Sequence, residues 1–364
     1  MELNNCVYNA SGPRTGSREA LKIIAGSASG AVLSKSATLV SQKGNDMPRF
    51  VKDIDLGAGK TNGSCNSEGL PNQGIDYYLS PQLLEEMKDS GKPYMVSISG
   101  LSLADNLEML EMIMAVKEVE AVELNLACPN VPGKPVIAYD FDQMDSVLKA
   151  VCGHKAFGRK PVGVKLAPYF DMPHFDTATS ILAKYPIHFV VCVNTIGNAL
   201  FVDAESETVL IAPKGGYGGL GGGYVKHTAL ANVKKVCEGL VAKGREDIDV
   251  VGVGGVSTGT DAFEMILCGA KAVQVGTCHW TEGAPCFERI TRELKSIMQK
   301  KGYSHIEDFR GRLKPYQKGV TKRGRPSCGG GKDGTSQWNM TTEVILVAII
   351  VAMLIERYFF LHIE

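Results

Sequence analysis

The sequence predicts an α/β protein built as a (β/α)8 TIM barrel, followed by a C-terminal basic linker and an apolar helix. Three observations indicate this fold. Eight short runs rich in Val and Ile occur along the chain, helical patterns separate most of them, and polar residues stand where the runs end. In such barrels the chemistry lies at the carboxyl ends of the strands. The alternative, a doubly wound sheet, usually has fewer strands and a GxGxxG motif after the first, which does not occur there.

The predicted strands and helices alternate along the chain. Each strand is a short apolar run bounded by turn residues, and each helix carries apolar residues at helical spacing. The predicted strands cover residues 6–10, 32–35, 94–99, 121–126, 162–166, 189–193, 249–253 and 273–276. The clearest predicted helices cover residues 105–119, 141–152, 229–243 and 262–268. We therefore expect one catalytic barrel domain over residues 1–314.

The composition favours a small-molecule ligand over a nucleic acid. Lys plus Arg and Asp plus Glu are equal at 39 each, so no net charge attracts a polyanion. The ten cysteines are scattered singly without a CxxC pair, which indicates reduced thiols. The seven histidines form no HxxxH or HExxH pair, so we expect no bound metal.

Glycines follow the last two predicted strands, as Gly254-Gly255 and Gly276-Thr277. Barrel enzymes commonly bind a phosphate with these two loops, because backbone N–H groups approach an anion closely where side chains are absent. A third glycine run, residues 215–223, precedes the helix that begins near His227. It is interpreted either as a source of further N–H donors or as a flexible loop.

Two lysines point to the nature of the ligand. Lys35 and Lys165 each stand near the end of an apolar strand, where an inward charge is costly unless it meets an anion. A cofactor that carries a phosphate, and whose ring gains negative charge on reduction, satisfies the lysines and the glycine loops together. FMN fits this description.

A cysteine between two asparagines ends the fourth predicted strand. The segment reads Asn125-Leu126-Ala127-Cys128-Pro129-Asn130-Val131-Pro132-Gly133-Lys134-Pro135, and its prolines prevent a helix from starting there. A buried, inert cysteine is the simpler interpretation. The flanking amides, however, suit a planar amide or carboxylate ligand, which makes Cys128 a candidate catalytic residue.

From about residue 7 to residue 314 the chain resembles the dihydroorotate dehydrogenases of class 1A, the soluble, fumarate-using type. The resemblance rests on the cysteine segment and on several further motifs. These are Asn9-Ala10-Ser11-Gly12, Ser34-Lys35-Ser36, Asn66-Ser67, Gly69-Leu70-Pro71-Asn72, Val193-Asn194-Thr195, Gly218-Gly219-Leu220-Gly221-Gly222 and Gly254-Gly255-Val256. It implies oxidation of (S)-dihydroorotate to orotate in pyrimidine biosynthesis, with FMN as cofactor, fumarate as acceptor and a homodimeric state.

The resemblance also implies roles for single residues. Cys128 is the base that removes a proton from C5 of dihydroorotate while C6 delivers hydride to the flavin. Cysteine thiols ordinarily ionise near pH 8.5, so the rate is predicted to rise with pH. Residues 129–139 are predicted to act as a lid. The substrate is expected to contact Lys35, Asn66, Gly69, Leu70, Asn125, Asn130, Asn194 and Thr195. The cofactor is expected to contact Ala10, Ser11, Gly12, Lys35, Ser36, Asn125, Lys165, Val193, Gly221, Gly222, Gly254, Gly255, Gly276 and Thr277.

One residue departs from the family pattern. The family usually has methionine where this chain has Glu68, and a carboxylate there should repel an anionic substrate unless its side chain turns outward. Together with the short amino terminus and the unusual tail, Glu68 keeps a second interpretation open, a membrane-tethered pseudoenzyme that holds flavin without turnover. A third is a flavin barrel that acts on another dihydropyrimidine.

The tail beyond the resemblance changes character. Residues 315–339 form a basic, glycine-rich linker, and the apolar run 344–355 is twelve residues long, too short by itself to cross a bilayer. If the pair Glu356 and Arg357 is tolerated near an interface, residues 340–364 provide a transmembrane or interfacial helix. The barrel is expected to lie in the cytoplasm, with this helix as a possible membrane anchor.

Overall fold

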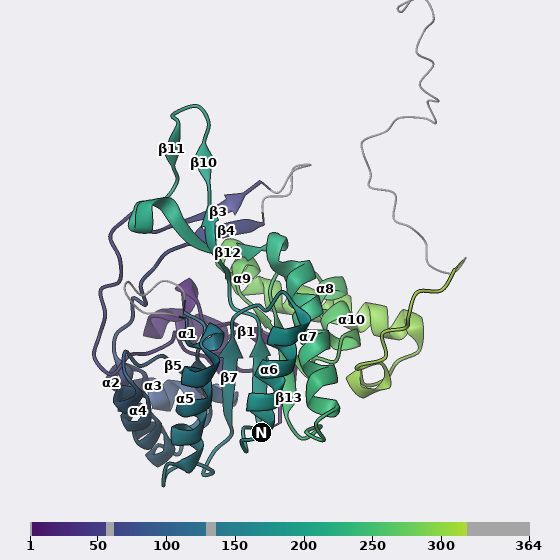
Figure 1. Cartoon of the computed structure of the whole chain (residues 1–364), viewed down its shortest axis with the longest axis horizontal. Helices are drawn as coiled ribbons and strands as arrows, with labels where there is room; N and C mark the ends of the chain where they lie inside the picture. The colour runs from purple at the N-terminus through teal and green to yellow at the C-terminus, as the bar shows by residue number, and fades with distance from the viewer. Residues whose placement is uncertain (1, 56–61, 129–135, 319–364) are drawn as a thin grey trace, which may run out of the picture. The chain divides into compact units, whose positions relative to one another are not determined.

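Eight parallel strands form the central sheet of the structure, a computed structural model that describes residues 2–55, 62–128 and 136–318 (Figure 1). The strands are hydrogen-bonded in the order β1, β14, β13, β8, β7, β6, β5, β2. They are β1 Val7–Asn9, β2 Val32–Leu33, β5 Tyr94–Ile98, β6 Val119–Asn125, β7 Val162–Leu166, β8 Phe189–Cys192, β13 Asp249–Val253 and β14 Ala272–Val275. Each coincides with one of the eight predicted strands, and sequence neighbours lie side by side. The predicted barrel is confirmed.

The side chain of Asn9 joins the two ends of this sheet. Its Nδ2 donates to the Leu33 carbonyl at 2.7 Å, and its Oδ1 accepts from the Leu33 N–H at 2.9 Å. These two bonds connect β1 to β2 in the way that a backbone pair would. The amide thereby brings the first and last strands of the order together, which completes the barrel.

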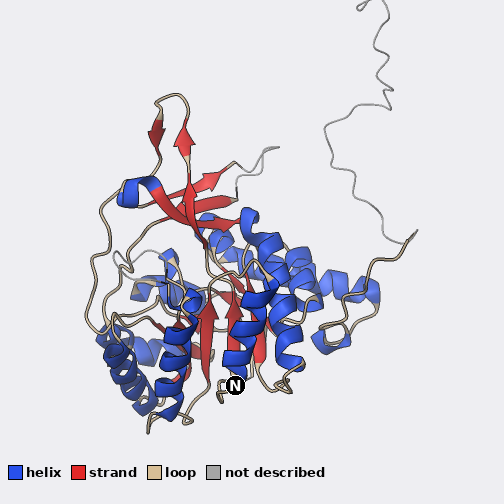
Figure 2. Cartoon of the chain, viewed as in Figure 1, coloured by secondary structure: helices blue, strands red, loops and turns tan. Residues whose placement is uncertain are grey.

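Helices surround the strands (Figure 2). They are α1 Arg18–Ala25, α2 Ile75–Tyr78, α3 Pro81–Asp89, α4 Leu103–Ala115, α5 Phe141–Gly153, α6 Met172–Ala183, α7 Lys226–Val241, α8 Gly259–Leu267, α9 Thr277–Glu282 and α10 Pro285–Lys301. Short 3-10 turns occupy η1 Pro13–Thr15, η2 Ile137–Tyr139, η3 Pro213–Gly216, η4 Gly223–Val225 and η5 Ile306–Asp308. Capping residues account for several helix starts, since Ser102 and Thr258 form capping boxes with the acidic residues three positions later. The four predicted helices are present as α4, α5, α7 and α8.

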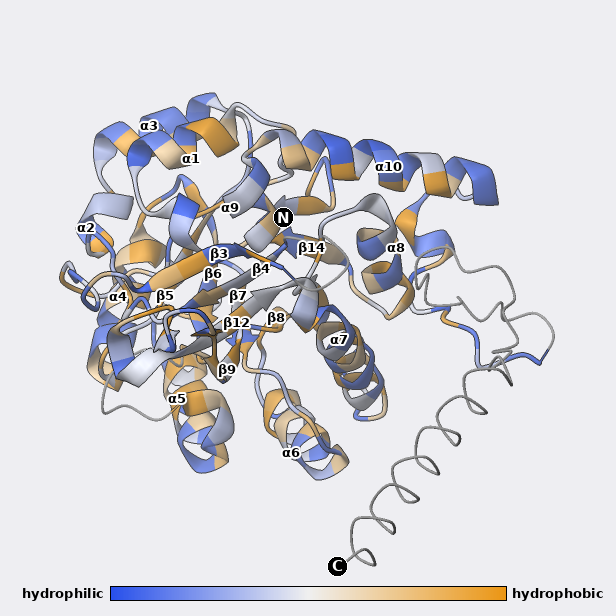
Figure 3. Cartoon of the chain, turned by 90° about the horizontal axis from the view of Figure 1, so that it is seen from above, coloured by the Kyte–Doolittle hydropathy of each residue, from blue (hydrophilic) through white to orange (hydrophobic). Residues whose placement is uncertain are grey.

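Apolar side chains form two separate clusters. The larger one lies between the strands and the helices and includes Leu110 and Val122. The smaller one is formed by alternate residues of the strands, among them Leu33, Met95 and Val191, which fill the barrel interior. Figure 3 shows hydrophobic and hydrophilic residues interspersed along α5 and α10, as expected for helices with one buried face. The barrel is thus a packed core, and its functional space lies at its end.

A small antiparallel sheet stands beyond the carboxyl ends of the barrel strands. Its order is β3, β4, β12, β9, with bounds Phe50–Ile54, Gly63–Asn66, Tyr217–Gly222 and Ile196–Leu200. The pair β10 Val202–Asp203 and β11 Thr208–Val209 extends it as a projecting hairpin (Figure 1). The glycine run 215–223 is therefore largely a central strand, and its interpretation as a flexible loop is wrong. Glycine is needed there because a Cβ on Gly219 would lie 2.2 Å from Thr195 Oγ1.

The chain divides into one unit at Met1–Leu313 and another at Lys314–Glu364. The predicted linker at 315–339 lies mostly outside the described residues, and the predicted helix at 340–364 lies wholly outside them. Within residues 2–55, 62–128 and 136–318, no helix is both long and apolar enough to cross a membrane. The domain boundaries stay predictions.

His279 on α9 makes the stability of the barrel depend on pH. It is 4% exposed, its ring centroid lies 5.0 Å from that of Phe287, and burial, with a smaller contribution from Arg14, lowers its pKa from 6.5 to about 4. The folded state then binds fewer protons than the unfolded state between these values. Consequently the free energy of unfolding decreases as the pH is lowered, and His279 contributes about 2 kcal/mol of this decrease between pH 7 and pH 4.5. In urea unfolding, the free energy of unfolding of His279→Gln should decrease by about 2 kcal/mol less than that of wild type over this pH range. An equal decrease in both proteins would contradict a lowered pKa of His279.

Candidate active site

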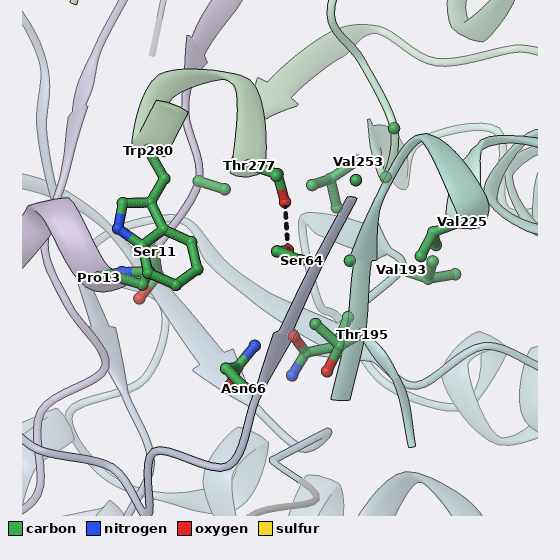
Figure 4. A pocket seen from close by; sticks show the side chains of 18 of the residues that line it. Ser11, Pro13, Ser64, Asn66, Val193, Thr195, Val225, Val253, Thr277 and Trp280 are labelled. Atoms are coloured by element: carbon green, nitrogen blue, oxygen red, sulfur yellow. Dashed lines mark hydrogen bonds between the residues drawn. The ribbon is translucent and has the colours of Figure 1, made fainter. Parts of the chain in front are cut away.

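A pocket lies where the carboxyl ends of the barrel strands meet the small sheet (Figure 4). All but one of the predicted site residues line it, and the exception, Asn130, lies outside the described residues. The predicted residues on its wall are Ala10, Ser11, Gly12, Lys35, Ser36, Asn66, Gly69, Leu70, Asn125, Cys128, Lys165, Val193, Asn194, Thr195, Gly221, Gly222, Gly254, Gly255, Gly276 and Thr277. Residues that are far apart in the chain thus share one cavity.

Asn125 at the end of β6 is held in one orientation. Its Nδ2 donates to Ser36 Oγ at 3.1 Å, and its Oδ1 accepts from the Ala127 N–H at 3.0 Å. Ser36 Oγ in turn lies 2.9 Å from Ser97 Oγ and 3.2 Å from Ser11 Oγ. Because these partners come from several strand ends, the network aligns the polar side chains before any ligand arrives.

Cys128 follows this network and is half-buried. The backbone just before it is tied down, since Asn194 Nδ2 donates to the Ala127 carbonyl at 2.7 Å. A thiol on the pocket wall is therefore positioned by amides from two strand ends. The predicted lid, residues 129–139, lies outside the described residues as far as residue 135.

Lys165 is a buried cation that lies next to a buried carboxylate. Its Nζ lies 3.9 Å from Glu123 Oε1, and Glu123 Oε2 accepts from Gln274 Nε2 at 2.7 Å. Gln274 Nε2 also lies 3.2 Å from the Tyr8 hydroxyl. Desolvation lowers the pKa of Lys165, Glu123 opposes this, and the nearby charge of Lys35 adds to it. The two lysines thus face one region of the pocket.

Lys35 is paired with Glu68. Its Nζ lies 2.6 Å from Glu68 Oε2, and both residues line the pocket. Glu68 does not turn outward, because its side chain is only 9% exposed, and its carboxylate therefore lies inside the pocket. Both lysines have a carboxylate of the chain itself beside them, so a bound anion is not needed to offset their charge.

The loops after β13 and β14 form a glycine-lined wall. Gly255 has a φ of +70°, and a Cβ there would lie 2.6 Å from Lys226 Cβ. Side chains are therefore excluded where the sequence predicted a phosphate site. Ser64 Oγ of β4 lies 3.0 Å from Thr277 Oγ1, a bond that fastens the small sheet to the end of β14 (Figure 4).

Several pocket residues were not predicted. They are Pro13, Asn62, Ser64, Glu68, Gly223, Val225, Val253, Val256, Ser257, Cys278 and Trp280. Of these, Glu68 had been noted as a departure from the family pattern, Gly223 as part of the glycine run and Val256 as part of a family motif. Ser64 is two positions before Asn66 on β4, so strand periodicity would have found it had β4 been predicted. Cys278 and Trp280 lie on α9, a helix too short for periodicity to identify.

The family model described as dihydroorotate dehydrogenase matches residues 1–298. The chain belongs to the dihydroorotate dehydrogenase family. It is 48% identical over 313 residues to "Probable dihydroorotate dehydrogenase A (fumarate)" of Streptococcus pneumoniae serotype 4, which covers 86% of this chain and 96% of that protein. It is also 48% identical over 311 residues to "Dihydroorotate dehydrogenase (fumarate)" of Kluyveromyces lactis, covering 85% and 94% of the two chains.

These relatives confirm the resemblance to the fumarate-using class 1A of dihydroorotate dehydrogenases. A crystal structure of DHODH from Eimeria tenella in complex with ferulenol superposes with a TM-score of 0.69 over 85% of this chain and 86% of that chain, at 20% identity. This likeness supports the barrel fold alone.

Proposed function

We propose that this chain oxidises (S)-dihydroorotate to orotate in pyrimidine biosynthesis and uses fumarate as electron acceptor, which yields succinate. The observation that carries the proposal is the convergence of Cys128, Asn125, Asn194 and Lys165 on one pocket wall. The high identity to proteins named as fumarate-type dihydroorotate dehydrogenases supports the choice of substrate and acceptor.

FMN is the cofactor that this pocket suits. The glycine backbone at Gly254-Gly255 and at Gly276, followed by the hydroxyl-bearing Thr277, fits its phosphate, and the hydroxyl groups of Ser11 and Ser36 fit polar ring atoms. When bound, FMN supplies the acceptor for the hydride that leaves C6 of dihydroorotate. Lys165, a buried cation on the same wall, would stabilise negative charge at the ring edge.

Cys128 is assigned as the base. As the thiolate it takes the proton from C5 of dihydroorotate, and the electron pair of that bond forms the C5–C6 double bond of orotate as hydride leaves C6. The bonds that hold Asn125 and the backbone before Cys128 keep the sulfur in place for this transfer.

The remaining polar residues are assigned to the pyrimidine ring and its carboxylate. Asn66, Asn125, Asn194 and Thr195 offer amide and hydroxyl groups from both the barrel and the small sheet, and Gly69-Leu70 covers one side. Asn130 is assigned the same role from the sequence alone. Fumarate resembles orotate in its carboxylate ends, so the same residues suit it once orotate has left.

The homodimer and the membrane attachment through residues 340–364 stay predictions. The acceptor is tested by steady-state oxidation of dihydroorotate with fumarate or with a soluble quinone. The proposal expects fumarate to support turnover at least tenfold faster at equal concentration. Turnover supported by quinone alone would contradict the assignment of fumarate, and release of FAD rather than FMN on acid denaturation would contradict the cofactor.

A further inference from the structure

Glu68 places a negative charge inside a pocket whose proposed ligands are anions. Among the described residues that line the pocket, Glu68 is the one acidic side chain, and Lys35 and Lys165 are the two basic ones. Its carboxylate lies 2.6 Å from Lys35 Nζ, with side chains 9% and 10% exposed. The charge of Lys35 is thus already balanced by the protein.

Hydrogen bonds fix the backbone around Glu68. The Asn45 N–H donates to the Glu68 carbonyl at 2.8 Å, and Asn45 Nδ2 donates to the Ser67 carbonyl at 2.7 Å. The Ser67 N–H donates to the Arg49 carbonyl at 2.7 Å. After Glu68 the chain turns through Leu70, a non-glycine residue at a φ of +54° whose carbonyl accepts from Asn72 Nδ2 at 2.8 Å. These bonds fix the backbone of the segment, and the bond from Lys35 Nζ holds the Glu68 carboxylate inside the pocket.

The other buried cation is balanced as well. Glu123 stands 3.9 Å from Lys165 Nζ, is fully buried and does not line the pocket. With both lysines paired, little positive charge is left to attract a ligand carboxylate, and Glu68 adds repulsion at close range. Repulsion grows with ligand charge, so a ligand with two carboxylates is disfavoured more than a ligand with one.

We propose that Glu68 is a specificity-determining residue that selects singly charged ligands over doubly charged ones at this site. The inference rests on the proposed function, in which dihydroorotate and orotate carry one carboxylate and fumarate and succinate carry two. Glu68 then weakens the binding of fumarate more than that of dihydroorotate. The concentration of fumarate therefore limits the rate of turnover before that of dihydroorotate does.

The test compares wild type with Glu68→Gln, which keeps the size of the side chain and an oxygen for Lys35 but removes the charge. Dissociation constants of orotate and succinate are measured on the oxidised, FMN-loaded protein from the change in flavin absorbance. We expect about tenfold tighter binding of orotate and about hundredfold tighter binding of succinate in the variant. In steady state, the KM for fumarate should fall relative to wild type.

Glu86→Gln is the matched control. Glu86 is also a paired carboxylate, with Arg18 at 2.6 Å, but it lies on α3 outside the pocket, so both dissociation constants should stay unchanged. Equal tightening of orotate and succinate in Glu68→Gln would overturn charge selection, and weaker binding of both would show that Glu68 only positions Lys35. Glu68→Met, which also removes the hydrogen bond, separates these outcomes, because charge selection predicts the same ratio of the two constants as in Glu68→Gln. If neither ligand binds to any of these proteins, the proposed function fails, and the inference fails with it.

Discussion

Replacing Cys128 by alanine is expected to lower the rate of dihydroorotate oxidation by about 10²- to 10⁴-fold, the usual contribution of a positioned general base. The other groups that face the pocket are left in place, so FMN should stay bound and the visible flavin spectrum should be retained. The measurement is the rate of flavin bleaching by dihydroorotate under anaerobic conditions, which reports the reductive step without the acceptor.

Cys152→Ala is the control for this variant. Cys152 is a half-buried cysteine on α5 that does not line the pocket, so its loss should change the bleaching rate by less than about threefold. If Cys128→Ala bleaches at the wild-type rate with a full complement of FMN, another group removes the proton and the assignment of the base is wrong.

Replacing Glu123 by leucine is expected to lower the free energy of unfolding by about 3–5 kcal/mol, because Lys165 would keep its charge in the barrel without a counter-ion. Glu123 is 0% exposed and Lys165 is 4% exposed, so water cannot compensate for the lost carboxylate. Urea unfolding of the purified proteins measures the effect.

Tyr8→Phe is the matched control for Glu123→Leu. Tyr8 is 2% exposed in the same barrel interior, and its hydroxyl makes a single 3.2 Å bond to Gln274, so its loss should cost about 1 kcal/mol. If Glu123→Leu costs no more than this control, Lys165 is neutral in the folded protein, and its assigned role beside the flavin would need to be abandoned.

The barrel could be predicted because its strands are continuous apolar runs. Strand β7 at Val162–Leu166 and strand β13 at Asp249–Val253 have the predicted limits, since a strand covered on both faces leaves an unbroken hydrophobic signal. The small sheet leaves no such signal. Strand β12 is mostly glycine, and its partner β4 lies about 150 residues earlier in the chain, so only their pairing in space identifies either as a strand.

The pocket wall could be predicted because barrel geometry brings strand ends together, whereas the charges behind it could not. Glu123 lies in an apolar run, and only the alignment of β6 with β7 brings it beside Lys165. The sequence left the direction of Glu68 open, since its contact with Lys35 joins residues 33 positions apart that no local pattern connects.

One anaerobic titration tests whether this chain is a working dihydroorotate dehydrogenase of the fumarate-using type. Dihydroorotate is added to the purified FMN-loaded protein, followed by fumarate, while the flavin absorbance is recorded. We expect bleaching by dihydroorotate and recovery of the yellow colour with fumarate. A flavin that stays oxidised in excess dihydroorotate would contradict this expectation and would favour a pseudoenzyme that holds the cofactor without turnover.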